Sequence, residues 1–225
     1  SMENDPRGYT EEFWKKLAEV DLLGLLIPEE FSGSGMDMLD AALVYHEFGR
    51  SLAPSPHFVS CVLAALLLLE AGSDEQKREW LPSIARGDAI LSPAWLEPEN
   101  GYGPRGVQVR AIEDQGNFVL SGTKLHCLYV RSCTRLLVLA RTGEDDAAID
   151  LFLVDPEAPG VTLEQQLSLA SDTQYRVTFD GVRVAFQDRL GSPGSGWGHW
   201  NKVMHQGIIL AAAQAVGGAE RALEI

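Results

Sequence analysis

The chain has 225 residues, of which 45% are apolar, so it can build a sizeable packed core, and its formal net charge is −14. Such an acidic balance argues against a nucleic-acid partner, which requires a basic surface. Cys61, Cys127 and Cys133 form no Cys-x-x-Cys pair and predict neither a disulfide framework nor a metal site. The longest apolar run, residues 61–69, is about half of a membrane span, so we expect a cytoplasmic protein without membrane contact.

Residues 10–90 have helical periodicity. Thr10 is placed to cap a first helix with Phe13, Leu17 and Val20 on one face, and the Pro- and Gly-containing segment 27–35 predicts its interruption. Asp37 is placed to cap a second helix, which we expect to end near Gly49. Its predicted apolar-face positions are Leu39, Ala42, Leu43 and His46.

Two further helices are expected before residue 90. The third follows Pro56 and continues to Gly72, and because it is apolar on all sides we place it at the centre of the helical bundle. Ser73 and Gln76 have the spacing of a capping box, which predicts a fourth helix ending near Gly87.

From residue 91 the apolar period changes from 3.6 to 2. Residues 107–111 alternate, the turn sequence 114–117 follows, and residues 118–120 begin a returning strand. Further strands are predicted at 136–141, 150–154, 161–164, and as a last pair at 175–179 and 182–184 around Asp180-Gly181. Several short strands without interleaved helices favour an antiparallel sheet or barrel over a Rossmann unit.

Residues 190–197 are predicted to be a flexible linker because of their glycines, serines and proline, and residues 199–225 have a long Ala-rich helical pattern. The predicted fold class is therefore α+β, with an all-helical N-terminal domain (1–90) and an antiparallel β-barrel-like middle domain (91–190). We expect 191–225 to be a linker and the first helix of a truncated C-terminal helical bundle, which must pack on something because a lone helix is marginal.

Local strings in this order resemble the acyl-CoA dehydrogenase family. They are LLGLLIPEEF (22–31), QKREWLP (76–82), Trp95-Leu96-Glu97-Pro98, Gly122-Thr123-Lys124, GSGW (194–197) and AVGGAERAL (215–223). The resemblance implies FAD as cofactor and an acyl-CoA thioester as substrate, which the family dehydrogenates between its α and β carbons. It also implies an electron-transfer flavoprotein as acceptor and a homo- or hetero-oligomer.

The residues that resemblance places against the flavin are altered. The threonine of the family's Thr-Glu-Pro motif falls at Leu96, beside Trp95, and its Trp-Ile-Thr motif falls on His126, Cys127 and Leu128. Leucine donates no side-chain hydrogen bond. These five positions are the predicted cofactor-binding residues, although Trp95, like Trp197, can equally be a core residue.

No catalytic residue is identified in this chain. The family's glutamate base, where it lies on the helix opening the C-terminal domain, falls near Gly207 with a neighbouring arginine near Ile208; its commoner location lies beyond Ile225. The serine that lines the family's CoA path falls at Tyr102. These departures leave two hypotheses: an FAD-dependent acyl-CoA dehydrogenase or a portion of one, and a non-catalytic partner subunit of a heteromeric one.

Charged residues and histidines have competing interpretations. A local basic pocket for CoA, or solvated strand-edge charges, would each explain the cluster of Arg105, Arg110, Lys124, Arg131 and Arg135. The five histidines lack metal-ligand spacing and are predicted to be structural or surface residues, His126 excepted. They are His46, His57, His126, His199 and His205.

Overall fold

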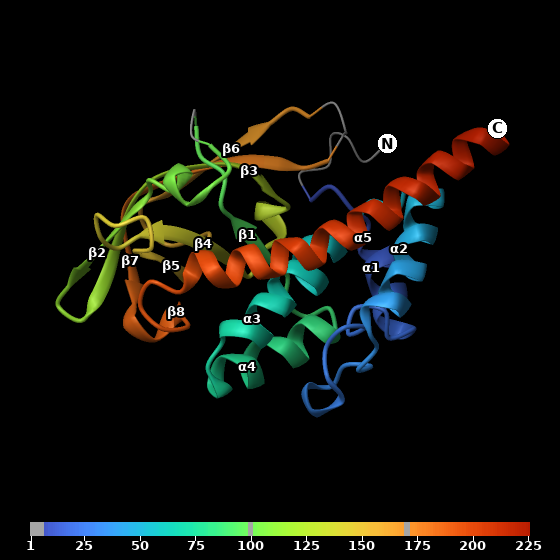
Figure 1. The fold of residues 1–225 in the computed structure, drawn as a ribbon, viewed down its shortest axis with the longest axis horizontal. Coiled ribbons are helices and arrows are strands. Elements are labelled where there is room, and N and C mark those ends of the chain that lie inside the picture. Colours follow the sequence, from blue (N-terminus) through green and yellow to red (C-terminus); the bar gives the residue numbers. More distant parts are fainter. Residues whose placement is uncertain (1–6, 99–100, 169–171) are drawn as a thin grey trace.

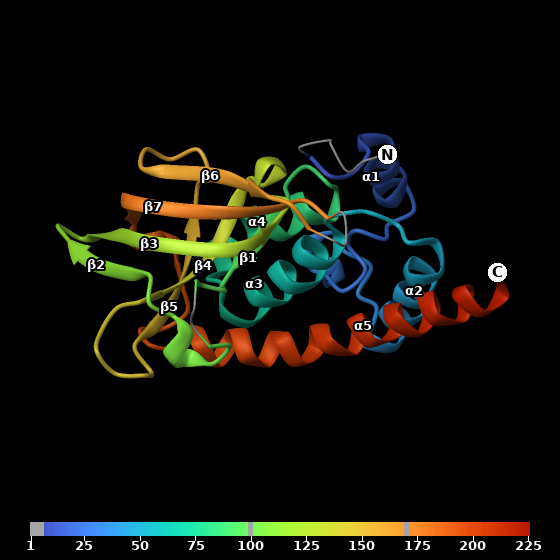
Figure 2. The same ribbon diagram turned by 90° about the horizontal axis from the view of Figure 1, so that it is seen from above.

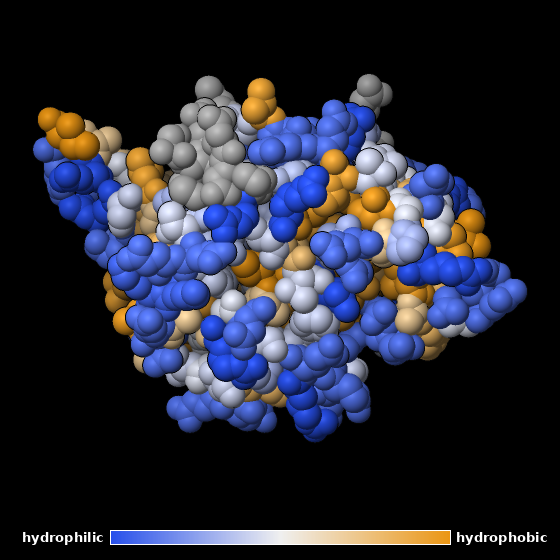
Figure 3. Space-filling model, turned by 180° about the vertical axis from the view of Figure 1, so that it is seen from behind, coloured by the Kyte–Doolittle hydropathy of each residue, from blue (hydrophilic) through white to orange (hydrophobic). Residues whose placement is uncertain are grey.

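The computed structural model describes residues 7–98, 101–168 and 172–225. Four short helices lie at one end of the molecule and a curved sheet lies at the other, and the long helix α5 (Gly196–Glu224) runs alongside both (Figures 1 and 2). The face opposite α5 is mostly hydrophilic with separate apolar patches, as expected from the acidic composition (Figure 3).

The first two helices start at the predicted caps. Helix α1 (Glu11–Glu19) begins at Thr10, whose side chain accepts a hydrogen bond from the Phe13 N–H. Helix α2 (Met38–Ser51) begins with a capping box between Asp37 and Asp40. A single 3₁₀ turn (Glu29–Phe31) lies between them.

Three details of these helices differ from the sequence prediction. Val20 lies just after α1 and is 62% exposed. Leu39 and Leu43 point outward, because α2 buries the face formed by Ala41, Tyr45, Phe48 and Gly49 instead. Helix α2 also passes through Gly49, since this glycine is needed for a close helix crossing rather than for a helix end.

The central helical segment is buried, as predicted. It starts with π-helical turns at Phe58–Ala64 and continues as α3 (Ala65–Ala71). Ser73 and Gln76 form the predicted capping box at the start of α4 (Asp74–Ala85). No described helix combines the length and the apolar character that crossing a membrane would require.

Among the described residues, the sheet has eight strands in the order β6-β7-β3-β2-β4-β5-β8, with β1 paired to β4. Most pairs are antiparallel, but β1 and β2 run parallel to β4. The predicted fold class is confirmed, with these two parallel pairings as an addition. The strands are β1 (Leu91–Ala94), β2 (Arg110–Asp114), β3 (Asn117–Leu128), β4 (Arg135–Arg141), β5 (Ile149–Val154), β6 (Val161–Gln166), β7 (Gln174–Ala185) and β8 (Arg189–Leu190).

The predicted hairpin around Asp180-Gly181 is wrong. Strand β7 continues through both residues and pairs with β3 along most of its length. Gly181 has a φ of +66°, and the register shifts between Leu120 and Gly122 on the facing strand. The glycine therefore permits a bulge in one long strand, which a local pattern cannot distinguish from a turn.

The linker before α5 is anchored rather than flexible. The buried Asp150 carboxylate accepts hydrogen bonds from the Gly194 N–H (2.6 Å) and from Thr142 Oγ1 (2.7 Å). Helix α5 starts at Gly196, earlier than predicted, because Trp197 and Trp200 already pack inward. These contacts attach α5 to the sheet.

Helix α5 also crosses α2 closely. A Cβ on Gly49 would lie 1.9 Å from the Gln214 carbonyl oxygen, and one on Gly217 would lie 1.9 Å from that of His46. Ion pairs flank the crossing, between Arg50 and Glu220 (3.5 Å) and between Arg50 and Glu224 (2.8 Å). Helix α5 thus joins the sheet to the helical part.

Candidate active site

The Glu97 and Lys124 side chains of the two motifs form one buried ion pair. Lys124 Nζ lies 2.6 Å from Glu97 Oε1, and the two side chains are 0% and 3% exposed. The Glu97 carboxylate also accepts the backbone N–H groups of Gln108 and Val109. Burial lowers the pKa of Lys124, and the Glu97 carboxylate opposes that effect.

This pair fixes a wall of strand and turn. The segment after β1 lies against β3, where the Leu125 N–H donates to the Leu96 carbonyl oxygen at 2.9 Å. Lys124 Nζ also lies 3.4 Å from the Trp95 carbonyl oxygen. The pair therefore positions the Trp95 side chain at the junction of the sheet with α5.

Two adjoining cavities of about 140 and about 200 Å³ lie at this junction and share Trp95, Trp200 and Met204. The Trp95 ring lies 5.3 Å from that of Trp200 and 6.2 Å from that of Tyr102, measured between centroids. The smaller cavity is also lined by Phe58, Val59, Leu63, Pro93, His126 and Leu128, and the larger by Tyr102, Trp197, Asn201, His205 and Ile208.

The structure brings together three of the five predicted site residues. Trp95, His126 and Leu128 line the smaller cavity. Leu96 does not line it and contributes its backbone carbonyl to the wall. Cys127 points into the core of the sheet, where burial raises the pKa of its thiol to about 12.

A bulge in β3 determines which side chains of residues 126–128 point to the cavity and which point to the core of the sheet. The pairing of β3 with β7 shifts between Lys124 and Cys127, and His126 has a φ of +53°. The His126 N–H donates to Gln166 Oε1 (3.0 Å), and its Nδ1 lies 2.8 Å from Gln174 Oε1. His126 is therefore held in place by polar partners beside the cavity.

Sequence reasoning missed the helical half of the lining. Trp200 and Met204 come from α5, and Phe58, Val59 and Leu63 come from the π-helical segment. A tryptophan and a methionine four residues apart on one helix were a usable signal, but core packing explains the same spacing. The partner of that helix face was not visible in the sequence.

No carboxylate is among the lining residues that the structure describes. Gly207, where one of the family's glutamate positions falls, is buried, and a Cβ there would lie 2.8 Å from Leu63 Cδ2. Ile208 lines the larger cavity as an exposed apolar side chain. The cavity lining that the structure describes therefore offers no carboxylate base for proton abstraction.

The other candidate residues have structural partners. Four of the highlighted cations pair with acids: Arg105 with Asp146, Arg110 with Glu144, Lys124 with Glu97 and Arg135 with Asp155. His57 is buried between Tyr45 and the Leu22 carbonyl oxygen, and burial lowers its pKa to about 4. Within residues 7–98, 101–168 and 172–225, no group of three or more His, Cys, Asp or Glu could hold a metal ion.

Comparison with known proteins agrees with the fold and the motifs. The N-terminal domain of acyl-CoA dehydrogenases matches residues 2–88, and the middle domain matches residues 92–182. The chain belongs to the acyl-CoA dehydrogenase family, whose members are flavoproteins.

Two of the similar curated proteins have the following identities. The mitochondrial short-chain specific acyl-CoA dehydrogenase of Rattus norvegicus is 31% identical over 217 residues, covering 93% of this chain and 53% of that protein. An acyl-CoA dehydrogenase of Bacillus subtilis (strain 168) is 30% identical, with 93% and 57% covered. The chain thus spans about half the length of the curated relatives it matches.

Solved structures superpose over nearly the whole chain. The Tcur3481-Tcur3483 steroid acyl-CoA dehydrogenase has a TM-score of 0.87 at 25% identity, covering 97% of this chain and 58% of that one. The ChsE4-ChsE5 complex of Mycobacterium tuberculosis has 0.86 at 28%, with 99% and 58% covered. A glutaryl-CoA dehydrogenase of Mycobacterium smegmatis, solved with FADH2, has 0.86 at 27%, with 96% and 56% covered.

The residues at the cavity fit a flavin only in part. Trp95 and Leu128 offer an apolar surface for a ring system, but neither Leu96 nor Leu128 has a side-chain donor for the ring's polar edge. The His126 N–H and Nδ1 are already engaged, and the contact between Trp95 and Trp200 narrows the space. The described residues therefore do not form a complete flavin site.

Proposed function

We propose that this chain is a subunit or portion of an FAD-dependent acyl-CoA dehydrogenase, in which it contributes an apolar wall and not the catalytic groups. One observation carries the proposal: an aromatic cavity lies beside the motif-bearing wall, and its described lining has no carboxylate and, at Leu128, no side-chain donor. The substrate would be an acyl-CoA thioester, with an electron-transfer flavoprotein as acceptor.

The dehydrogenation reaction requires groups that a second chain segment would have to supply. Dehydrogenation requires a base for the α proton and hydrogen bonds that stabilise the developing enolate oxygen. FAD, when bound, supplies the acceptor for the β hydrogen. Because the described cavity lining offers Trp95, Leu128 and Trp200 but no carboxylate base, this chain would orient the acyl group and exclude water.

The test is flavin content, alone and in complex. We expect the purified chain to remain colourless after incubation with FAD and desalting, and to be stabilised against heat by an acyl-CoA when paired with a full-length family member. Trp95→Ala should reduce that stabilisation, whereas Trp80→Phe, a change in a buried ring outside the cavity, should not. Retention of one FAD per isolated chain would contradict the proposal.

A second candidate is a chain that holds FAD itself by packing and backbone contacts. It is favoured by the ion pair between Lys124 and Glu97, which keeps the wall in place although the neighbouring polar side chains are altered. It predicts a yellow preparation in the absence of any partner, so the same absorbance measurement separates the two candidates.

A further inference from the structure

The larger of the two adjoining cavities at the candidate active site is lined mainly by aromatic rings. Three of the five tryptophans of the chain, Trp95, Trp197 and Trp200, surround a space of about 200 Å³ together with Tyr102. The other residues of this lining are Asn201, Met204, His205 and Ile208. The described lining thus contains no lysine, arginine or carboxylate, so a phosphate or carboxylate group would find no cationic partner in it.

The rings form a concave wall and not a stack. The Trp95 ring is tilted by 44° against that of Trp200 and by 48° against that of Tyr102, with centroid separations of 5.3 and 6.2 Å. A parallel stack would cover the ring faces, whereas tilted neighbours leave part of their faces open to the cavity. Trp200 is buried, and Tyr102 is 78% exposed. Aromatic surface is therefore present both deep in the cavity and on its solvent side.

The electrostatics of this cavity favour a cation. The faces of aromatic rings carry partial negative charge, and the net charge of the chain is −14. His205 Nδ1 lies 2.7 Å from the Asn201 carbonyl oxygen, which only accepts hydrogen bonds, so Nδ1 carries the hydrogen. In the neutral ring Nε2 is then an acceptor, and none of the described residues donates a hydrogen bond to it.

We propose that this cavity binds a quaternary ammonium group, such as a trimethylammonium, through cation–π contacts. Cages of tryptophan and tyrosine recognise such groups. An ordinary ammonium would need several hydrogen-bond acceptors or a carboxylate when it leaves water, whereas a quaternary ammonium has no N–H to satisfy. The inference deepens the proposed function and rests on it: the acyl group would carry this cation, with its alkyl part in the neighbouring cavity of about 140 Å³.

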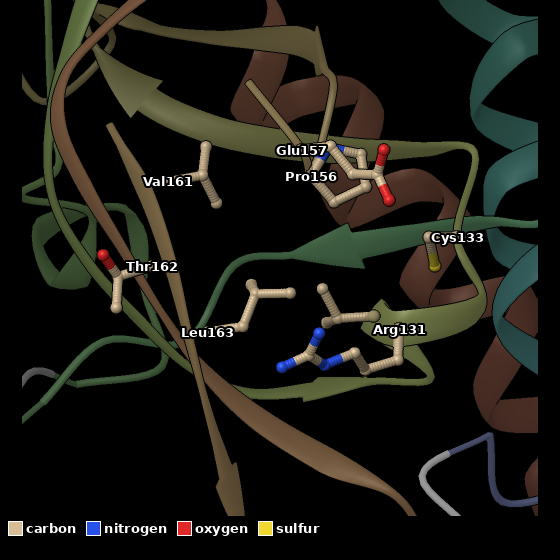
Figure 4. A pocket seen from close by; sticks show the side chains of 8 residues that line it. Arg131, Cys133, Pro156, Glu157, Val161, Thr162 and Leu163 are labelled. Carbon is tan, nitrogen blue, oxygen red and sulfur yellow. The ribbon is translucent and has the colours of Figure 1, made fainter. Parts of the chain in front are cut away.

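A separate cavity beside β6 shows the opposite chemistry. It measures about 340 Å³ and lies between the turn after β3, the loop after β5 and the start of β6 (Figure 4). Arg131 and Glu157 line it, and its described lining includes no aromatic residue. A cation at this cavity would be attracted by the Glu157 carboxylate, whereas a cation at the aromatic cavity would be attracted by ring faces. Variants at the two cavities therefore separate the two kinds of attraction.

Calorimetric titration of the chain with choline tests the proposal. The comparison ligand is its uncharged isostere dimethylbutanol, in which a carbon atom replaces the nitrogen. Because the net charge of −14 attracts any cation, the salt concentration is kept at about 0.15 M. Choline should bind about fivefold or more tighter than the isostere, the factor that corresponds to about 1 kcal/mol of cation–π attraction.

Two substitutions of Tyr102 report on the ring face. Tyr102→Ala should weaken choline binding about two- to fivefold, as expected for a cation–π contact at an exposed ring. Tyr102→Phe keeps the ring and should bind choline like wild type. Glu157→Gln is the matched control, because it removes a carboxylate from the cavity beside β6, and it should leave choline affinity unchanged. Circular dichroism verifies that each variant is folded.

Equal affinity for choline and its isostere would overturn the proposal, because the cavity would then be merely apolar. Failure of choline to bind would overturn it too, as would a loss in Tyr102→Phe as large as that in Tyr102→Ala. Loss of choline binding in Glu157→Gln would assign the cation to the other cavity. These titrations use neither FAD nor a partner subunit, so a negative result leaves the flavin-content test of the proposed function unaffected.

Discussion

Lys124 and Glu97 bury opposite charges between β3 and the segment that follows β1. In Glu97→Gln the Lys124 ammonium would lose its counter-ion while remaining 0% exposed, and the Gln108 and Val109 amides would lose a charged acceptor. We expect a loss of about 3–5 kcal/mol in the free energy of unfolding. Chemical denaturation at pH 7 measures this loss.

The matched control is Arg105→Gln, which breaks the exposed pair with Asp146. Exposed pairs contribute little, so its unfolding midpoint should stay close to that of wild type. If Glu97→Gln were as stable as Arg105→Gln, the ion pair would not be what holds the wall.

The lowered pKa of His57 makes the free energy of unfolding depend on pH. Its pKa in the folded protein is about 4, lowered from 6.5 by burial, although its hydrogen bond to the Leu22 carbonyl opposes that effect. As pH falls below 6.5, the unfolded chain binds a proton that the folded protein does not bind until about pH 4. Stability is therefore complete above pH 6.5 and falls towards pH 4, by roughly 3 kcal/mol.

The variant His57→Gln isolates this contribution, because carboxylates also titrate in the same range. It should be less stable than wild type at pH 7, since the hydrogen bonds to Tyr45 and Leu22 are disturbed. Its stability should depend less on pH between 6.5 and 4. Parallel denaturation curves for the two proteins across that window would refute the assignment.

Some residues of the candidate site could be predicted from the sequence, and others could not. The resemblance located Trp95 and Leu128 at the cavity, because the motif register is local. It placed Cys127 at the same site, but the bulge at His126 keeps Cys127 facing the core. The polar partners of His126 come from β6 and β7, which no local pattern identifies.

At the level of elements, the crossing of α2 with α5 depends on glycine. In Gly49→Ala the new methyl group would lie 1.9 Å from the Gln214 carbonyl oxygen, so the helices must move apart. Alanine favours a helix by about 1 kcal/mol, but overpacking costs about 1–3 kcal/mol and separates the flanking ion pairs as well. We expect a net loss of stability, measured by thermal unfolding.

Gly198→Ala in α5 is the matched control. This glycine is exposed, and a Cβ there would have no neighbour within 4 Å. We expect a gain of up to about 1 kcal/mol from helix propensity alone. Equal effects of the two substitutions would show that propensity, and not the close approach of α2 and α5, governs Gly49.

The crossing of α2 with α5 explains why the predicted buried face and end of α2 were wrong. Periodicity gave the starts of α1, α2 and α4, because caps and first-turn residues act locally. It assigned the wrong face to α2, because the buried face is chosen by what packs against it. Gly49 indicated a helix end in the sequence, but its role became apparent only when α5 was in place.

At the level of the whole molecule, helix α5 completes the cavity from a part of the chain far from the motifs. Trp200 packs in the same core as the helical bundle and contacts Trp95 of the sheet side. The sequence predicted this helix and its need for a partner. It did not predict that α5 would span both halves of the molecule, because the tether through Asp150 is a long-range contact.

Leu128 distinguishes this cavity wall from the flavin-binding pattern that the family resemblance implies. The variant Leu128→Thr restores a hydroxyl donor at a position that lines the cavity. One hydrogen bond is worth about 0.5–1.5 kcal/mol, so FAD affinity should rise roughly two- to 12-fold. Fluorescence titration with FAD measures this change, with Leu128→Val as the control of similar size. Dehydrogenation should remain absent, because the described cavity lining still lacks a carboxylate base. Equal FAD affinity in the two variants would mean that the apolar side chain of Leu128 is not what excludes the flavin.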